Sequence, residues 1–183
     1  MRLEEKKKIY LMFSQSGTRF SKFLRFMTKS KYVHISLSFD EALEEVYSFG
    51  RKNPYKILPA GLVKENILAL IEAYSGIKCM IYEMEIDKKI YRRLKKNLNK
   101  FLKEQDKYAY DILGLPFIYL KKRYQRKYHR VCSQFVGNLL QDSGVYDFKV
   151  HYSLITPEHF YDIPNKKLLY EGELINYITK KRQ

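Results

Sequence analysis

Residues 32–39, YVHISLSF, alternate strictly between apolar and polar side chains, and this pattern constrains the fold more than any other. The apolar positions are Val33, Ile35, Leu37 and Phe39, and the polar positions are His34, Ser36 and Ser38. Strict alternation predicts a β-strand with one buried face and one polar face. Antiparallel sheets provide such strands, whereas strands of parallel sheets are buried on both faces.

Other short segments also favour strands. Residues 8–15 are rich in strand formers, and residues 78–86 alternate in the same way as 32–39. Residues 44–51 predict a strand that returns along 32–39 to form a hairpin, and residues 167–178 predict a final strand pair or hairpin. The strands and helices follow one another without βαβ regularity, which predicts an α+β fold with an antiparallel sheet.

Three segments predict helices, and one predicts a segment without regular secondary structure. Asp87 is expected to cap a helix, and a second helix runs from about residue 132 to 142. A third, basic helix is expected within 19–31. Residues 53–66 contain two prolines and a glycine and therefore predict irregular structure. The apolar stripe of the first helix is Ile90, Leu94, Leu98, Phe101 and Leu102.

Length and composition fit one globular domain over residues 1–183, with 45% hydrophobic residues. The two cysteines show no metal-ligand spacing, so neither a metal nor another cofactor is expected. No long apolar run marks a signal peptide or a membrane span. We therefore expect a cytoplasmic protein. Its 35 basic and 20 acidic residues give a net charge of +15, which favours polyanions and a peripheral position at an anionic membrane.

Cys132 lies at the start of the second helix, in RVCSQFVGNLLQ. A free cysteine is most often a small buried hydrophobic residue. At a helix start, however, free N–H groups and the helix dipole favour a thiolate, and His129 and Arg130 add positive charge nearby. Cys132 is therefore a candidate nucleophile.

His34 is a candidate general base, because it is the histidine placed in the middle of a predicted strand. The small Ser36 on the same face leaves room for a substrate and is a candidate substrate contact. A third polar group is expected to orient the imidazole. With a three-residue loop in the hairpin, His34 lies opposite Ser48, and a different loop moves its partner to Tyr47 or Phe49. Ser48 is the first candidate for the third residue and Glu45 the alternative.

The segments YVHISLSF, EEVYSFGRK, YDILGL, RVCSQFVGNLLQDSGV and ITPEHF together resemble the permuted NlpC/P60 papain-like proteins, which include the YiiX-like and lecithin:retinol acyltransferase-like groups. The resemblance covers residues 8 to about 160. In the permuted branch the histidine strand precedes the cysteine helix, as His34 precedes Cys132 here. Family members commonly carry His or Glu about a dozen residues after the catalytic histidine, where this chain has Val46, so either Ser48 or Glu45 takes this role or the triad is incomplete.

The resemblance implies a papain-like fold, in which a small antiparallel sheet or barrel packs against the cysteine helix. It also implies a Cys132–His34 dyad in a cysteine hydrolase or acyltransferase that acts through a thioester acyl-enzyme. Amidase, peptidase and lipid-ester activities all fit this chemistry, so the expected substrate is a small peptide or a lipid-like molecule. The context of Tyr110 in YDILGL resembles that of a tyrosine in the family, and Tyr110 is a candidate substrate contact.

The alternative function is a basic binding module without catalysis. Basic residues fill the exposed sides of the helix over 88–103, and residues 121–130, KKRYQRKYHR, interleave basic and aromatic side chains. Such surfaces can hold phosphates while tyrosines stack on bases. No known nucleic-acid-binding motif is present in the sequence, which favours an anionic membrane surface over nucleic acid as the polyanionic partner.

Overall fold

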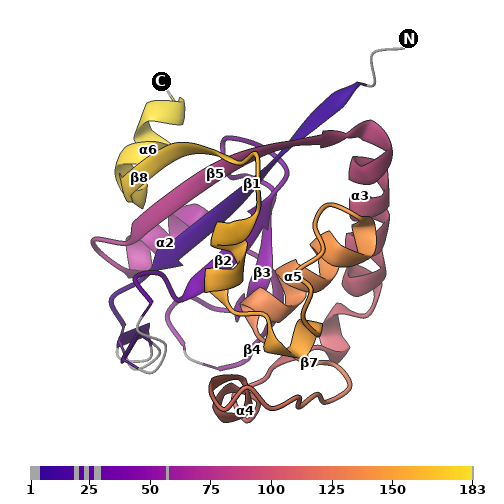
Figure 1. Cartoon of the computed structure of the whole chain (residues 1–183). Coiled ribbons are helices and arrows are strands. Elements are labelled where there is room, and N and C mark those ends of the chain that lie inside the picture. Colours follow the sequence, from indigo (N-terminus) through magenta and orange to yellow (C-terminus); the bar gives the residue numbers. More distant parts are fainter. Residues whose placement is uncertain (1–4, 19–20, 23–24, 27–29, 57, 183) are drawn as a thin grey trace.

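The computed structural model describes residues 5–18, 21–22, 25–26, 30–56 and 58–182 (Figure 1). The strands are β1 Lys6–Gln15, β2 His34–Ser38, β3 Val46–Arg51, β4 Ala60–Lys64, β5 Lys78–Asp87, β6 Ala109–Tyr110, β7 His129–Arg130 and β8 Lys167–Glu173. The α-helices are α2 Ile67–Ala73, α3 Lys88–Lys103, α4 Leu115–Tyr119, α5 Cys132–Ser143 and α6 Leu174–Arg182. Short 3-10 helices are η1 Gln105–Lys107, η2 Tyr152–Leu154 and η3 Pro157–Asp162.

The main sheet of the described chain has the strand order β4-β3-β2-β1-β5-β8, and every neighbouring pair is antiparallel. This confirms the predicted α+β class with an antiparallel sheet. β6 and β7 form a separate parallel pair, in which Tyr110 lies opposite Arg130.

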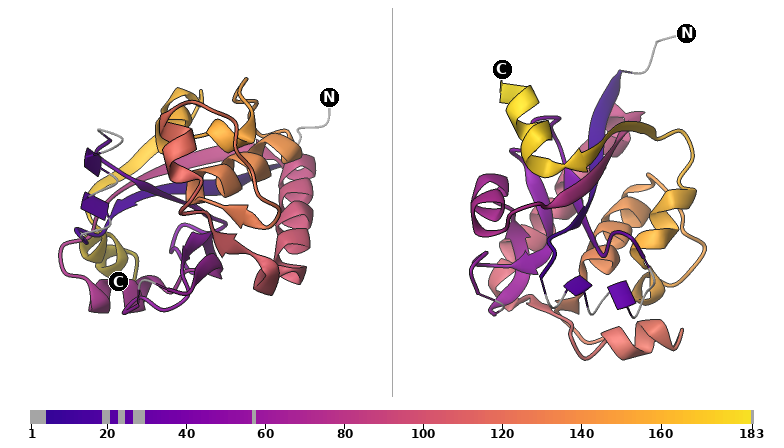
Figure 2. Two further views of the ribbon diagram at one scale, coloured as in Figure 1. Left: turned by 90° about the horizontal axis from the view of Figure 1, so that it is seen from below. Right: turned by 90° about the vertical axis from the view of Figure 1, so that its left-hand side faces the viewer.

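Helices cover both faces of the main sheet (Figure 2). On one face α3 and α5 pack against the larger core, to which β1 contributes Ile9, Leu11 and Phe13. On the other face α2 and α6 pack against a smaller core that includes Met12. Because successive strand residues point to opposite faces, β1 is buried on both sides. Of the two expected arrangements, an antiparallel sheet or a small barrel, the described residues form the sheet, which is open and lies between two helical layers.

The helix that begins at Cys132 is confirmed, and it is almost entirely buried. Phe135, Val136, Leu139 and Leu140 form its contacts with the larger core. The helix ends where Gly144 adopts a left-handed conformation with φ of 74°, a conformation that glycine adopts at little cost.

Three sequence predictions about this sheet were wrong. Residues 167–178 form β8 followed by α6 rather than a strand pair, because Leu174, Tyr177 and Ile178 pack on the smaller core. The segment 53–66 contains β4 at the sheet edge. In the hairpin of β2 and β3, Leu37 lies opposite Tyr47, so continuation of this register places His34 beside Gly50 rather than Ser48.

The predicted basic helix over residues 19–31 falls largely on positions outside the described residues. Among the helices that the structure describes, none has the length and apolar character that a membrane span requires.

Candidate active site

Cys132 is the first residue of α5, and the side chain of Gln134, in the same first turn, fixes this helix start. The amide oxygen of Gln134 accepts a hydrogen bond from the Val131 N–H at 3.1 Å, and its nitrogen donates to the Ser153 carbonyl at 2.9 Å. Cys132 is only 3% exposed, and its Sγ lies 3.9 Å from the Val33 carbonyl oxygen. The thiol is therefore held at the boundary between α5 and the residue that precedes His34.

His34 begins β2 and forms an ion pair with a carboxylate from the far edge of the sheet. Its Nε2 lies 2.7 Å from Oε1 of Glu65, which directly follows β4. The side chain of Glu65 is only 6% exposed, and that of His34 is 27% exposed. Because a carboxylate only accepts hydrogen bonds, Nε2 carries the proton in this contact, and Nδ1 is the ring nitrogen available to the thiol.

Two buried serines contact one oxygen of the Glu65 carboxylate, Oε1, while its other oxygen, Oε2, is buried without a hydrogen-bond partner. Ser36 donates a hydrogen bond to Oε1 at 2.9 Å, and Ser48 donates to the same oxygen. Ser36 also lies 3.2 Å from Nε2 of His34. Both hydroxyls are fully buried, so they fix the carboxylate and, through it, the imidazole ring.

The electrostatics of the three groups favour a thiolate beside an imidazolium. Burial would raise the pKa of Cys132, but the positive charge and hydrogen bond of His34, with hydrogen bonds from the Ile35 and Ser133 backbones, lower it below its usual value. Burial would lower the pKa of His34, but the charges of Glu65 and Cys132 raise it well above 6.5. The pKa of Glu65 is lowered, because His34 and the two serines outweigh the effect of its burial.

Tyr110 reaches the same thiol from β6. Burial raises the pKa of its hydroxyl well above the usual value, and the charge and hydrogen bond of Cys132 add to this shift. Next to it, the buried Asp111 fixes the loop by accepting hydrogen bonds from the Gly114 N–H and from Arg126. Tyr110 is thus a neutral phenol held at the Cys132 thiol.

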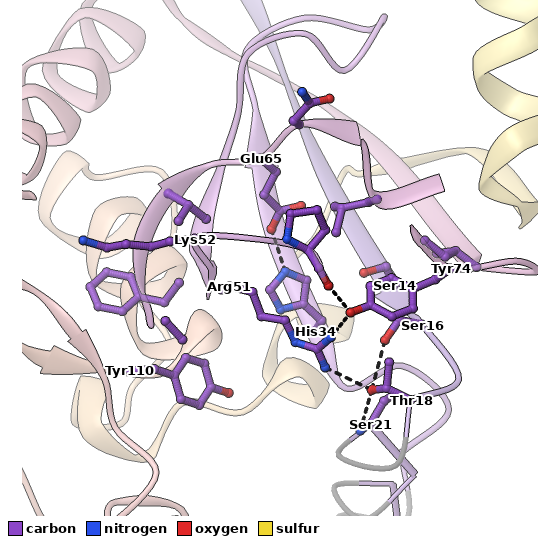
Figure 3. Close-up of a pocket in the computed structure, with 18 of the residues that line it drawn as sticks. Ser14, Ser16, Thr18, Ser21, His34, Arg51, Lys52, Glu65, Tyr74 and Tyr110 are labelled. Atoms are coloured by element: carbon purple, nitrogen blue, oxygen red, sulfur yellow. Dashed lines mark hydrogen bonds and ion pairs between the residues drawn. The ribbon is translucent and has the colours of Figure 1, made fainter. Parts of the chain in front are cut away.

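A cavity of about 220 Å³ opens beside these residues. Val33, His34 and Tyr110 form the part of its wall that contacts Cys132, although Cys132 itself does not line it. Figure 3 shows the His34 ring beside the Glu65 carboxylate, with a dashed line for their ion pair, and the Arg51 side chain close to the ring. A molecule in the cavity can therefore touch the imidazole and the phenol that surround the thiol.

The structure brings Cys132, His34, Ser36, Ser48 and Tyr110 together, but it does not bring Glu45 to them. Glu45 lies at the hairpin tip and pairs with Lys95 of α3. Ser48 contacts Glu65 rather than the His34 ring. Ser36 was expected to contact the substrate, but it is buried and does not line the cavity.

Sequence reasoning missed Glu65, the carboxylate that actually contacts His34. The available signal was the short apolar run Leu62–Val63 followed by Lys64 and Glu65, which has the pattern of a strand that ends in polar residues. Because the two prolines and the glycine in 53–66 favoured an irregular segment, this strand and its terminal carboxylate were not recognised.

Comparisons with protein-family models, with curated proteins and with solved structures give no match to this chain. Within the residues that the structure describes, no group of three or more His, Cys, Asp and Glu side chains is arranged to hold a metal ion.

Proposed function

We propose that the protein is a cysteine hydrolase or acyltransferase, with Cys132 as nucleophile, His34 as general base and acid, and Glu65 as the residue that orients and charges His34. The observation that carries the proposal is the imidazole of His34, which pairs with Glu65 at 2.7 Å and lowers the pKa of the Cys132 thiol. This combination of nucleophile, base and orienting group is typical of nucleophilic catalysis. The papain-like fold, suggested by the resemblance to permuted NlpC/P60 proteins, belongs to the same proposal.

In the first step, the Cys132 thiolate attacks a carbonyl carbon and forms a carbon–sulfur bond. N–H groups in the first turn of α5 stabilise the negative charge that develops on the carbonyl oxygen. His34 then gives its proton to the leaving nitrogen or oxygen as the bond to the carbonyl carbon breaks. The product of this step is a thioester on Cys132 and a free amine or alcohol.

In the second step, His34 takes a proton from water or from an acceptor alcohol or amine, which attacks the thioester carbonyl. The carbon–sulfur bond breaks, the thiolate is restored, and a carboxylic acid or a new acyl product leaves. Glu65 keeps the imidazole in one orientation throughout, and Ser36 and Ser48 hold the carboxylate in place.

The proposal is tested by mass spectrometry of the acyl-enzyme, with hydroxylamine as the acceptor in a parallel reaction. A panel of activated esters, thioesters and amides should leave an acyl group on Cys132 and form hydroxamate when hydroxylamine is present. Cys132→Ala should abolish both signals. Two results together would contradict the proposal. Cys132 of the folded protein would be no more reactive than free cysteine, and Cys132→Ala would leave the esterase rate unchanged.

A second candidate function, attachment to an anionic membrane surface, is favoured by the segment that follows Tyr110. Ile112, Leu113, Tyr119 and Leu120 are 44–62% exposed, and Lys121, Lys122 and Arg123 follow them directly. Adjacent apolar and basic side chains suit the boundary between headgroups and acyl chains. This segment would place the cavity near a bilayer.

Co-sedimentation with liposomes tests this second function. Vesicles with anionic lipid should retain the protein, neutral vesicles should retain much less, and Leu113→Ser with Leu120→Ser should reduce retention on both. Equal retention of the wild type and the double variant would contradict a role for this segment.

A further inference from the structure

We infer that the cavity beside His34 contains an anion-binding subsite centred on Arg51, and that the substrate is a short apolar acyl compound with a carboxylate or phosphate group. This inference rests on the proposed function for the position of the scissile carbonyl. The subsite itself is a property of the cavity and can be measured without catalysis.

The guanidinium of Arg51 projects into the cavity from the end of β3 (Figure 3). Its Nη1 donates to the hydroxyl of Tyr74, and its Nη2 donates to the hydroxyl of Thr18 at 3.3 Å. The guanidinium carbon also lies 5.3 Å from the centroid of the Tyr74 ring. These contacts fix the side chain while they leave several of its five N–H donors for a ligand.

The partners of Arg51 are neutral, which is unusual for a guanidinium in a cavity. No ion pair joins Arg51 to an Asp or Glu among the residues that the structure describes. The acidic side chain in the wall is Glu65, and its charge is matched by His34 at 2.7 Å. Lys52 and Lys64 also line the cavity, and Lys52 pairs with Asp106 at 4.0 Å. A carboxylate or phosphate is the group that such a guanidinium binds most strongly.

A second observation is an unpartnered hydroxyl on Ser21, whose N–H donates to the same Thr18 oxygen that accepts from Arg51. The Oγ of Ser21 is buried on the cavity wall and has no hydrogen-bond partner. Ser21 is 5% exposed, so this hydroxyl has lost its contacts with water. A buried hydroxyl without a partner is costly, and an anionic oxygen of a ligand would accept its hydrogen bond.

Most of the remaining wall is apolar and determines the body of the ligand, with Ser14, Ser16 and Asn66 as further polar side chains. Met12, Val63, Leu70, Ile77 and Leu174 line it. At about 220 Å³ the cavity is smaller than the about 300–1,000 Å³ typical of sites for drug-sized ligands. It therefore suits a short chain or a small ring, with its anionic end at Arg51 and its acyl carbonyl toward His34.

Titration calorimetry on the Cys132→Ala protein tests the subsite directly, with octanoate, octyl phosphate, octanol and octylamine as probes. We expect octanoate or octyl phosphate to bind about tenfold or more tightly than octanol, and octylamine to bind most weakly. The ratio of the two anions tells whether the natural group is a carboxylate or a phosphate.

Substitutions then assign the preference to Arg51. Arg51→Gln should make the anionic probes and octanol bind alike, and Arg51→Lys should keep part of the preference. Arg92→Gln removes the same charge from an exposed position on α3 and should keep all of it. Two results would overturn the inference. One is equal affinity for octanol and the anions in the Cys132→Ala protein with Arg51 intact, and the other is a preference for the anions that survives Arg51→Gln. Because the nucleophile is absent from this protein, neither result depends on the reactivity of Cys132.

Discussion

Cys132 and Cys79 are both buried, yet they lie in opposite electrostatic surroundings. Burial, with a small contribution from Glu171, raises the pKa of Cys79 to about 12, whereas His34 lowers the pKa of Cys132. Because the thiolate is the reactive form, alkylation by iodoacetamide should modify Cys132 and spare Cys79 in the folded protein. The rate should stay high well below pH of about 8.5, the usual thiol pKa.

His34→Gln provides the matched variant for this rate profile. Without the imidazolium, burial dominates, so the pKa of Cys132 should rise and alkylation at neutral pH should slow on the order of tenfold or more. Peptide mapping at several pH values measures the rate for each cysteine. A profile for Cys132 that is identical in the wild type and in His34→Gln would contradict the pairing.

Glu65→Gln tests the ion pair through stability, because glutamine keeps the acceptor oxygen for Ser36 and Ser48 and removes only the charge. We expect a loss of about 1–3 kcal/mol rather than the about 3–5 kcal/mol of a fully buried pair. The smaller figure applies because His34 is 27% exposed and can release its proton.

The pH dependence of this loss follows from the two shifted pKa values. The lowered pKa of Glu65 gives stability that is present above its unfolded value of about 4.3 and lost as the pH falls through the folded value. The raised pKa of His34 gives stability that is present below about pH 6.5 and lost as the pH rises through the folded value. Urea denaturation should therefore show the largest difference between wild type and Glu65→Gln at about pH 5.5, and a difference that does not change with pH would contradict the pair.

Of the candidate site, Cys132 and His34 could be predicted, because each lies in a segment with a clear period: a buried helix and an alternating strand. The carboxylate partner could not, because its position depends on pairing between strands. The hairpin loop is longer than expected: Asp40 accepts hydrogen bonds from the Glu44 and Glu45 N–H groups, and Leu43 adopts a φ of 60°. A leucine gives no sequence signal for this left-handed conformation.

Strand β4, at the edge of the sheet, packs closely against the segment that carries Tyr110. A Cβ atom at Gly61 would lie 2.4 Å from the carbonyl oxygen of Tyr108, which is backbone and cannot move alone. Gly61→Ala should therefore push β4 and β6 apart, although alanine elsewhere in a strand stabilises by roughly 0.5–1 kcal/mol relative to glycine. We expect a net loss of about 1–3 kcal/mol in urea denaturation.

The same substitution should also slow alkylation of Cys132, because Glu65 follows β4 and Tyr110 belongs to β6. Glu72→Ala, at an exposed position of α2 outside the cavity wall, is the control and should leave both stability and alkylation rate near those of the wild type. A Gly61→Ala protein that gains stability would show that the two strands can separate without cost.

The order of helices and strands along the chain was easier to predict than the contacts that each of them makes with other elements. Alternation in β2 and the apolar stripe of α3 are local patterns, and both elements form where they were expected. The end of the chain was misassigned because Lys167–Glu173 and Leu174–Arg182 are continuous in sequence, with no glycine or proline between the strand and the helix. The chain changes from strand to helix here because Leu174 and Tyr177 of α6 are then buried in the smaller core against the sheet.

The excess of positive charge acts on the whole molecule. The chain has 35 basic and 20 acidic residues, so its net charge is +15, and like-charge repulsion opposes the compact state. Exposed ion pairs such as Lys6–Asp87 and Lys88–Glu5 act in the other direction, but each contributes only about 0–1 kcal/mol. Repulsion should therefore dominate the response of stability to salt.

Thermal denaturation in NaCl between about 0.02 and 0.5 M tests this balance, because the screening length falls from about 20 Å to a few ångströms over that range. We expect the midpoint temperature to rise with salt. Arg92→Gln with Lys96→Gln removes two exposed charges from α3 and should raise the midpoint at low salt and flatten its dependence. Arg92→Lys keeps the charge and should behave as the wild type. A midpoint that falls with salt would mean that the ion pairs outweigh the repulsion, and the basic surface would then stabilise the fold instead of straining it.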